Sequence, residues 1–408
     1  MPNGFIHSAL RPPVYFYHIP KTGGMSLRSF LADQYLNEEL CPAQDWQSLA
    51  ALDRAALQSF RLFYGHFAVN LKQYLPSDVR TITYLRSPVG RTVSTLRHMM
   101  RDPSFHPLHE HVKGRALRDV IYDDELLSTF QDAQTKLLSF DVPIDDVLAY
   151  VRRQVAAGKF VDIGELEWES SPDKALHALE AYDFVGLMDH FKDSMWAMCG
   201  KFGFAPPDIM PDLNRATDEQ NPGDLNDKDI AHLRSFLAGD IKIYDTIRQK
   251  ALERLSGEQI FADMVHNGIL TKLSTPFELD LGRPFLGSGW YEPETQRGRS
   301  VRWSGPESKA LLHLPLPRDA KRSLYVEFIK SKGIGNVEML VDGEEVEART
   351  ECYDNVWSME AELAPLSADK RPVVTTITLD CRRPSRPKER NDGDLRALGL
   401  LLLTVKVD

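Results

Sequence analysis

The sequence predicts an α/β domain with a parallel sheet flanked by helices, followed by an all-β sandwich or jelly-roll domain. Strand-like segments alternate with helical patterns up to about residue 255, which is typical of parallel α/β folds. Past about residue 262, short alternating segments separated by Gly, Pro and Asp-Gly turns replace the helices. A chain of 408 residues also exceeds one ordinary core. We therefore expect a first domain over 1–262, a linker over 263–276 and a β-sandwich over 277–408.

Composition narrows the possible classes of function. The chain is 42% hydrophobic and 26% charged, as in ordinary soluble proteins, and its net charge of -10 argues against nucleic acid as the main partner. Its 4 cysteines are widely spaced without a CxxC pair, so we expect free thiols and no bound metal. The sequence has no apolar run of membrane-spanning length and no signal-peptide pattern at its N-terminus. We therefore expect a cytoplasmic protein without a transmembrane segment.

The first predicted unit is a strand, a glycine-rich turn and a helix. Residues 14–19 (VYFYHI) are β-branched and aromatic, and residues 20–24 (PKTGG) break the strand. Apolar residues at helical spacing then predict a helix over 25–35. Unpaired backbone N–H groups and the helix dipole converge at such a junction, where Lys21 adds a charge and Thr22 and Ser26 add hydroxyls. This stretch predicts a phosphate-binding turn.

Further strands and helices follow in alternation. Strands are expected over 61–64, running into Gly65 and His66, and over 80–85, meeting Arg86. Ser87 suits an N-cap and Pro88 the first turn of a helix over 89–100. Residues 117–157 have a mostly helical pattern, 184–188 form a short strand with a helix to 202, and two helices cover 225–237 and 241–255. The polar, proline-bearing segment 206–223 is long enough to be a lid or binding loop.

The C-terminal strands are expected from alternating apolar residues between turns. They are 277–281, 300–303, 310–314, 324–329, 337–341, 356–361, 373–379 and 398–407, with a solvated loop over 382–394.

The glycine-rich turn matches one nucleotide-binding family in its order of residues. It is neither a Walker A loop, because Lys21 precedes the glycines, nor GxGxxG. The order Pro-Lys-Thr-Gly-Gly-Met-Ser resembles the 5'-phosphosulfate loop of PAPS-dependent sulfotransferases of the carbohydrate branch, with Met25 where threonine is commoner. That family holds the 3'-phosphate with an arginine at a strand end and a serine eight residues on, and Arg86 and Ser94 have this spacing.

A third segment sharpens the resemblance. Residues 63–66 (FYGH) resemble the place where heparan and other uronyl 2-O-sulfotransferases carry their catalytic histidine, although the family typically has His-Gly-His and this chain has only Gly-His. Residues 132–138 and 184–188 resemble later landmarks of that family. The resemblance covers about 14–255 and does not reach the sandwich.

The resemblance implies a P-loop-like sulfotransferase fold, PAPS as the donor with PAP as its product, and no metal. The acceptor would be a hydroxyl of a carbohydrate, possibly acidic, such as a bacterial polysaccharide or glycoconjugate. Lys21 and His66 would be catalytic, as the stabiliser of the leaving phosphate and as the general base. The implied donor-binding residues are Lys21, Thr22, Gly23, Gly24, Met25, Ser26, Arg86, Ser94, Asn214 and Arg215, and the candidate acceptor-binding residues are Arg97, His98 and Arg101.

Other interpretations remain open at this point. Lys21 could belong to an ordinary turn, Arg97 and Arg101 could form a solvated charged face, and His18 is more readily a structural residue of its strand. An atypical P-loop nucleotide kinase is one alternative function, and a glycan-binding protein with a degenerate transferase domain is another. The sequence leaves the acceptor, the hydroxyl sulfated and the oligomeric state open.

The sandwich carries its own resemblance. Residues 287–294 (GSGWYEPE), Gly298, 302–304 and the closing strand 394–400 resemble a module appended to bacterial polysaccharide-processing glycosyltransferases. Trp290, Tyr291 and Trp303 could stack on sugars, but aromatic residues dominate small cores and the structural interpretation is preferred.

Overall fold

The computed structural model describes residues 11–67, 69–103, 108–204, 225–254, 257–267, 273–283, 285–386, 394 and 396–408. These residues form two compact units, one from 11–198 with 225–254 and the other from 199–204 with 257–408. The boundary expected at residue 262 lies inside helix α14 (Gly257–His266), which belongs to the second unit.

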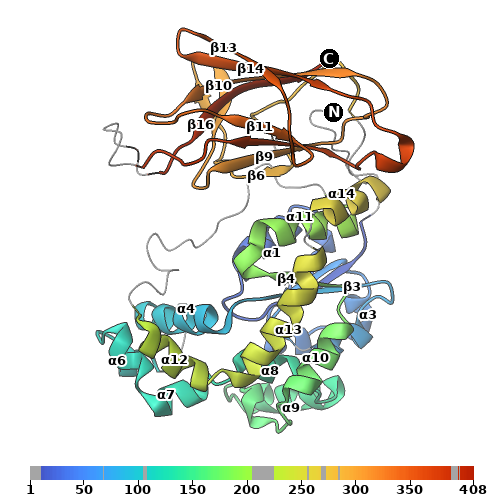
Figure 1. The fold of residues 1–408 in the computed structure, drawn as a ribbon. Coiled ribbons are helices and arrows are strands. Elements are labelled where there is room, and N and C mark those ends of the chain that lie inside the picture. The colour runs from blue at the N-terminus through green and yellow to red at the C-terminus, as the bar shows by residue number, and fades with distance from the viewer. Residues whose placement is uncertain are drawn as a thin grey trace. The chain divides into compact units, whose positions relative to one another are not determined.

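The first unit contains a four-stranded parallel sheet covered by helices (Figure 1). Its strands are β1 (Val14–Tyr17), β2 (Leu62–Gly65), β3 (Arg80–Leu85) and β4 (Phe184–Leu187), in the order β2-β1-β3-β4. Every residue of β1 and β2 is buried, as expected for a parallel sheet with both faces covered. The chain leaves β1 for β2 on one side and returns to β3 on the other side, so β1 is a topological switch point.

Helices follow the strands as the sequence predicts, with different bounds. The helix after β1 is α1 (Gly24–Ala32), and the helix after β3 is α4 (Pro88–Arg101). The others in this unit are α2 (Trp46–Ala50), α3 (Arg54–Leu57), α5 (His109–Val112), α6 (Leu117–Ile121), α7 (Asp124–Thr129), α8 (Ala133–Leu138), α9 (Ile144–Ala156), α10 (Pro172–Glu180), α12 (Asp227–Ser235) and α13 (Ala238–Arg254); α11 (Phe191–Phe202) begins in it. Short 3-10 turns cover Asn37–Glu39, Val69–Tyr74, Ile163–Glu165 and Met188–His190.

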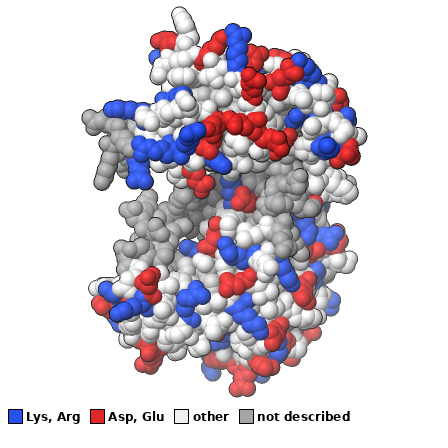
Figure 2. All heavy atoms as spheres, viewed as in Figure 1, with Lys and Arg blue, Asp and Glu red and all other residues white. Residues whose placement is uncertain are grey.

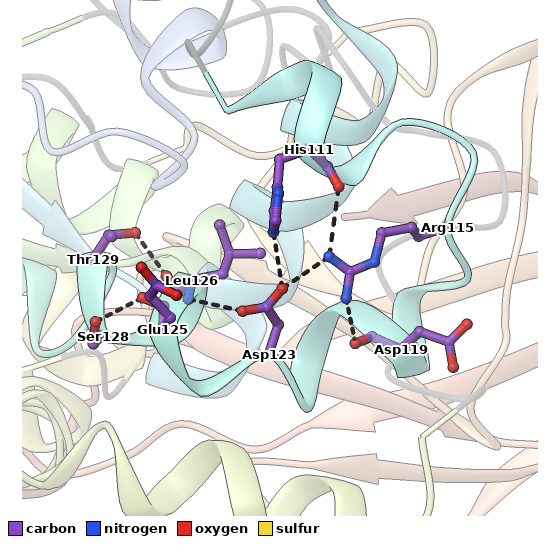
Figure 3. Close-up of polar contacts among 8 residues, drawn as sticks. All are labelled: His111, Arg115, Asp119, Asp123, Glu125, Leu126, Ser128 and Thr129. Atoms are coloured by element: carbon purple, nitrogen blue, oxygen red, sulfur yellow. Dashed lines mark hydrogen bonds and ion pairs between the residues drawn. The ribbon is translucent and has the colours of Figure 1, made fainter.

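A separate helical core lies beside the sheet core. Apolar side chains of α4, α5, α6, α7 and α12 pack together there, among them Leu96, Val112 and Leu233. Figure 3 shows the polar contacts that join three of these helices: the Asp123 carboxylate accepts from Arg115 at 2.8 Å and lies 3.0 Å from Nε2 of His111. Asp123 also caps α7 by accepting the Leu126 N–H at 3.1 Å.

The second unit is an antiparallel β-sandwich, as predicted (Figure 1). Its core-facing residues alternate with outward-facing ones, as in β10, where Leu324, Val326 and Phe328 are buried. One sheet has the order β13-β14-β10-β16-β8-β7, with β5 on β16, and the other β12-β11-β15-β9-β6. The bounds are β5 (Phe277–Glu278), β6 (Gly287–Ser288), β7 (Glu294–Gln296), β8 (Arg299–Trp303), β9 (Lys309–Leu314), β10 (Arg322–Lys330), β11 (Glu338–Val341), β12 (Glu344–Glu345), β13 (Ala348–Tyr353), β14 (Val356–Leu363), β15 (Thr375–Asp380) and β16 (Leu400–Val407), with a 3-10 turn at Ala368–Lys370.

Candidate functional site

The predicted site segments lie at one edge of the parallel sheet. Lys21 follows β1, His66 follows β2 and Arg86 follows β3, and these three strands are adjacent and parallel. Their carboxyl ends therefore share one edge, at the switch point where open α/β sheets bind ligands. The fold thus brings together residues that lie 65 positions apart, since Arg86 donates a hydrogen bond to Lys21.

The turn after β1 is held in an unusual backbone conformation. Lys21 has φ 71° and Gly23 has φ 79°, both in the left-handed region that a lysine rarely adopts. The Thr22 hydroxyl donates to the Ile19 carbonyl at 2.8 Å and closes the turn. No side chain caps the start of α1, and its first turn has no acidic residue. The positive end of the helix dipole at this turn favours an anion.

Both glycines of the turn are in tight contact with neighbouring side chains. A Cβ on Gly23 would lie 2.4 Å from the sulfur of Met188, and one on Gly24 would lie 1.8 Å from Nε2 of His18. Larger residues would therefore displace the turn or its neighbours. After the turn, Ser26 is buried, whereas Met25 is 50% exposed at the position where the resembling family more often has threonine.

Arg86 is the most firmly held residue of the site. It is only 8% exposed, and its Nη1 donates to the Lys21 carbonyl at 3.2 Å. Its backbone is fixed by Gln134, whose Oε1 accepts the Arg86 N–H at 3.1 Å and whose Nε2 donates to the Arg86 carbonyl at 3.0 Å. This paired contact fixes the point at which β3 passes into α4.

Gln134 is itself anchored by a buried carboxylate. The Asp240 side chain accepts the backbone N–H of Gln134 at 3.2 Å, and the N–H and hydroxyl of Thr135 at 2.7 and 2.9 Å. Gln134 and Asp240 are both fully buried. The start of α8 is thereby tied to α13 and, through Gln134, to the Arg86 backbone.

The first turn of α4 leaves room for the Arg86 side chain. A Cβ on Gly90 would lie 3.5 Å from Nε of Arg86 and 2.6 Å from the Ser87 hydroxyl. Gly90 and Ser94 are four residues apart, so they share a helix face, and Ser94 is half-buried on it. Nε of Arg86 therefore lies beside the first turn of α4, near the helix face that also carries Ser94.

Ser87 occupies the predicted N-cap position of α4, but its side chain does not cap the helix. Its hydroxyl and N–H instead donate to Asp189 at 3.0 and 2.8 Å, and the Tyr244 hydroxyl donates to the same carboxylate at 2.8 Å. Burial lowers the pKa of the Arg86 guanidinium, and the nearby Asp189 carboxylate offsets part of this lowering. Ser87 is therefore the N-cap residue of α4, as predicted, and its hydroxyl is bound to Asp189.

His66 has a defined hydrogen-bond partner and tautomer. Its Nδ1 lies 2.9 Å from the His18 carbonyl oxygen, which only accepts, so Nδ1 carries the proton and Nε2 has the lone pair. Although the side chain is exposed, the protein atoms packed around it lower its pKa by desolvation, and the bond to His18 raises it by less. The ring is therefore neutral at pH 7 and has an acceptor nitrogen.

Positive groups gather around Lys21. Burial, followed by repulsion from Arg101 and Arg86, lowers the pKa of the Lys21 ammonium. The pKa of His98 is lowered by burial, Lys21 and Arg101, while Asp102 raises it. The structure thus brings the acceptor candidates His98 and Arg101 within electrostatic range of Lys21. Arg97 lies half-buried on the same helix.

Two predicted donor-binding residues, Asn214 and Arg215, lie outside the described residues. Within the described part of the chain, no three His, Cys, Asp or Glu side chains gather as a metal site. No helix among those residues has the length and apolar character needed to cross a membrane.

The sequence reasoning missed several residues that support the site. Gln134 and Asp189 hold Arg86 and its neighbour. Gln134 lies in the segment 132–138, whose family-like pattern was a signal for it. The ring of His18, which was expected to be structural, contacts both Gly24 and His66. Their partners come from distant parts of the chain, which a single sequence does not reveal.

In the sandwich, the predicted aromatic residues have internal partners. The Trp290 Nε1–H donates to the Leu311 carbonyl at 2.8 Å, and the Tyr291 hydroxyl donates to the Ala397 carbonyl at 3.1 Å. Trp303 is half-buried in β8. These contacts favour the structural interpretation of Trp290 and Tyr291.

Comparisons with known proteins give only distant similarities. No known family profile and no curated protein sequence matches the chain. A sulfotransferase from Alicyclobacillus acidocaldarius is 15% identical, with 59% of this chain and 97% of that chain covered and a TM-score of 0.32. A family 35 carbohydrate-binding module from Clostridium thermocellum is 12% identical (33% and 98% covered, TM-score 0.21), and the mannan-recognising module TmCBM27 is 10% identical (32% and 94%, TM-score 0.19). Similarities this weak establish neither family nor activity.

Proposed function

We propose that the protein is a PAPS-dependent sulfotransferase of P-loop-like fold that transfers a sulfuryl group to a carbohydrate hydroxyl. The observation that carries the proposal is that Lys21, His66 and Arg86 follow three adjacent parallel strands and meet at the switch point of the sheet. Each of the three had been singled out by a separate sequence motif. Their convergence at one sheet edge is what a shared donor and acceptor site requires.

The donor would be held by the turn after β1 and by the start of α4. The uncapped first turn of α1, without an acidic residue, suits the 5'-phosphate, and the Lys21 charge would neutralise the oxygen that links phosphate and sulfur. The buried Arg86 would offer a bidentate fork to the 3'-phosphate, with the Ser94 hydroxyl on the same helix face. The contact from Arg86 to the Lys21 carbonyl would couple the two phosphate sites.

The acceptor hydroxyl would be activated by His66. Its Nε2 has the lone pair, because Nδ1–H is engaged by the His18 carbonyl. In the reaction, the hydroxyl oxygen forms a bond to sulfur while the bond from sulfur to the phosphate oxygen breaks. The hydroxyl proton passes to Nε2, and the phosphate leaves with the bonding electrons beside Lys21. The carbohydrate nature of the acceptor rests on the resemblance of 63–66 to uronyl 2-O-sulfotransferases.

The experiment that tests the proposal is a screen of desulfated polysaccharides with sulfur-labelled PAPS. We expect label transfer by the wild-type protein and a loss of about 100-fold or more in Lys21→Ala and His66→Ala. Lys159→Ala and His177→Ala are matched controls, because both side chains are exposed and distant in sequence from the site segments. Turnover of ATP but not PAPS would instead identify the protein as a nucleotide kinase, and turnover of neither, with no binding of PAP, would refute the proposal.

A further inference from the structure

The ring of His18 contacts both the donor turn and the ring of His66. The space that a Cβ on Gly24 would occupy is filled by this imidazole, with Nε2, Cδ2 and Cε1 at 1.8, 2.1 and 2.2 Å from it. The centroid of the same ring is 4.5 Å from that of His66, with the planes inclined by 33°. One side chain therefore contacts both the start of α1 and the residue proposed as the base.

The backbone of His18 is bound to the same segment as its ring. Its N–H donates to the Gly65 carbonyl at 3.1 Å, and its carbonyl accepts the Nδ1–H of His66 at 2.9 Å. These bonds do not involve the His18 side chain. A substitution at position 18 can therefore remove the ring while the bonds that select the His66 tautomer are retained.

The His18 ring is neutral in a positively charged site. Burial, followed by repulsion from His66, Lys21 and Arg28, lowers its pKa to about 3. These groups reach it from three places: His66 follows β2, Lys21 lies in the turn and Arg28 is on α1. A proton accepted by Nε2 of His66 would therefore have a neutral aromatic neighbour rather than a second cation.

We propose that His18 is a positioning residue whose neutral ring sets the spacing between the donor turn and the base His66. The catalytic part of this inference rests on the proposed function. The geometric part rests on the contacts of His18 with Gly24 and His66. His18 accepts and donates no proton in the reaction in this role. The requirement is for a flat, neutral aromatic ring, which the somewhat larger phenylalanine also provides.

The test compares His18→Phe with His18→Ala by two independent measurements. In the first, NMR follows the Cε1–H of His66 through a pH titration, which needs neither donor nor acceptor. We expect the wild-type and His18→Phe proteins to give the same lowered pKa for His66. In His18→Ala, water reaches the imidazole from the vacated side, so its pKa should rise towards about 6.5.

The second measurement is kcat/KM as a function of pH. Loss of the spacer should reduce kcat/KM about 10- to 100-fold in His18→Ala, with the acid limb moved to higher pH, and less than about threefold in His18→Phe. Calorimetric binding of PAP should change less than kcat/KM, because His18 touches the turn but does not supply its donors. If both variants are equally inactive, a ring nitrogen is required at position 18. If the pKa of His66 is unchanged in His18→Ala, the His18 ring has no effect on the base. Either result overturns the inference.

A double substitution tests whether His18 and Gly24 occupy one space. Gly24→Ala alone should be severely damaging, because its methyl group overlaps the His18 ring. In the His18→Ala background, the same methyl group enters the vacated space, so its effect on kcat/KM should be smaller than in the wild-type background. Strictly additive losses would contradict the shared space. If the His66 titration responds as expected but PAP does not bind, the spacing survives and the proposed sulfotransferase function fails.

Discussion

Lys21 stands out among the site residues because its backbone is strained. For a residue with a Cβ, the left-handed conformation at φ 71° is roughly 1–2 kcal/mol less favourable than the right-handed one. The turn keeps this conformation because Arg86 binds the Lys21 carbonyl and the Thr22 hydroxyl binds Ile19. A glycine would fit the backbone better, so a lysine at this position favours a role for its ammonium group.

Replacing Lys21 separates stability from activity. In Lys21→Gly the strain is relieved, and we expect a free energy of unfolding about 1 kcal/mol higher than in Lys21→Ala, which retains a Cβ. Both variants should lose sulfuryl transfer alike, since neither has the charge. Urea unfolding and PAPS turnover measure the two quantities. A glycine variant less stable than the alanine variant would argue that the turn is not strained.

The lowered pKa of His66 predicts the pH profile of the reaction. A general base works in its neutral form. Desolvation lowers the pKa of His66, so its ring stays neutral at pH values below the ordinary pKa of histidine. The acid limb of kcat/KM should therefore have its midpoint below about pH 6.5, with a plateau through neutrality. Initial rates from pH 5 to 8 measure it, with His177→Ala as a control that should leave the midpoint in place. A midpoint above the ordinary value would contradict the assigned environment.

His18 predicts a pH dependence of stability. Its pKa is about 3 in the folded protein and about 6.5 in the unfolded chain, so only the unfolded chain takes up a proton between these values. The free energy of unfolding is therefore not reduced by His18 above about pH 6.5. It decreases as the pH falls from there towards 3, because the unfolded chain gains a proton at His18 that the folded protein does not. His18→Phe should flatten the decline between about pH 6.5 and 4.5 in chemical unfolding. An identical decline in both proteins would locate the effect elsewhere.

At the scale of elements, Gln134 joins α8 to the end of β3. Gln134→Ala would leave the N–H and carbonyl of Arg86 without their partner in a buried place, which costs roughly 1–3 kcal/mol. We expect lower stability and weaker PAP binding, measured by urea unfolding and calorimetry. Gln47→Ala, at an exposed position of α2, is the control. Lower stability with unchanged PAP affinity would mean that Gln134 supports the fold but does not position Arg86.

The contacts of Asp123 predict the acid stability of the helical core (Figure 3). Hydrogen bonds from Arg115, then His111 and the Leu126 N–H, lower the pKa of Asp123 to about 2. The ionised Asp123 carboxylate therefore stabilises the fold fully above about pH 4, which is the pKa of aspartate in the unfolded chain. This stabilisation is lost as the pH falls through about 2. Asp123→Ala should lower stability at pH 7 by about 1 kcal/mol through the lost cap alone. A variant with wild-type stability at pH 7 would show that the contacts of Asp123 do not stabilise the helical core.

The existence of most elements could be predicted from the sequence, and their limits less well. β-branched and aromatic runs identified β1 to β4, and each of the predicted C-terminal segments overlaps a strand. Strand β13 was missed because nearly all its side chains are exposed, so it lacks the alternation that marks a half-buried strand. Ser87 is the N-cap of α4, as local preference predicted, but the bond of its hydroxyl to Asp189, 102 residues away, could not be predicted from the sequence.

At the scale of the whole molecule, charge is distributed differently at the surface and in the site. On the face drawn in Figure 2, acidic and basic side chains are interspersed, and the net charge is -10. In the site, by contrast, burial of Lys21 and then the nearby positive charges of Arg101 and Arg86 lower the pKa of Lys21. A cationic site in an acidic protein suits a polyanionic ligand of small size better than a nucleic acid.

The candidate site could be predicted only in part from the sequence, for a reason that concerns the whole fold. Lys21 and Arg86 belong to local motifs, so they could be recognised one at a time. The order β2-β1-β3-β4, which makes their strands neighbours, is a long-range property that a single sequence does not display. The support from Gln134, Asp240 and Asp189 depends on that order as well.

In the proposed function, the site recognises a nucleotide through a 3'-phosphate held by Arg86. Calorimetric titration of the full chain with PAP and with AMP, which lacks the 3'-phosphate, tests it most directly, with Arg153→Ala as an exposed control for Arg86→Ala. We predict that the wild-type protein binds PAP at least about tenfold more tightly than AMP, and that Arg86→Ala abolishes this preference while Arg153→Ala keeps it. Equal affinities for PAP and AMP in the wild-type protein, or a preference that survives in Arg86→Ala, would contradict the account.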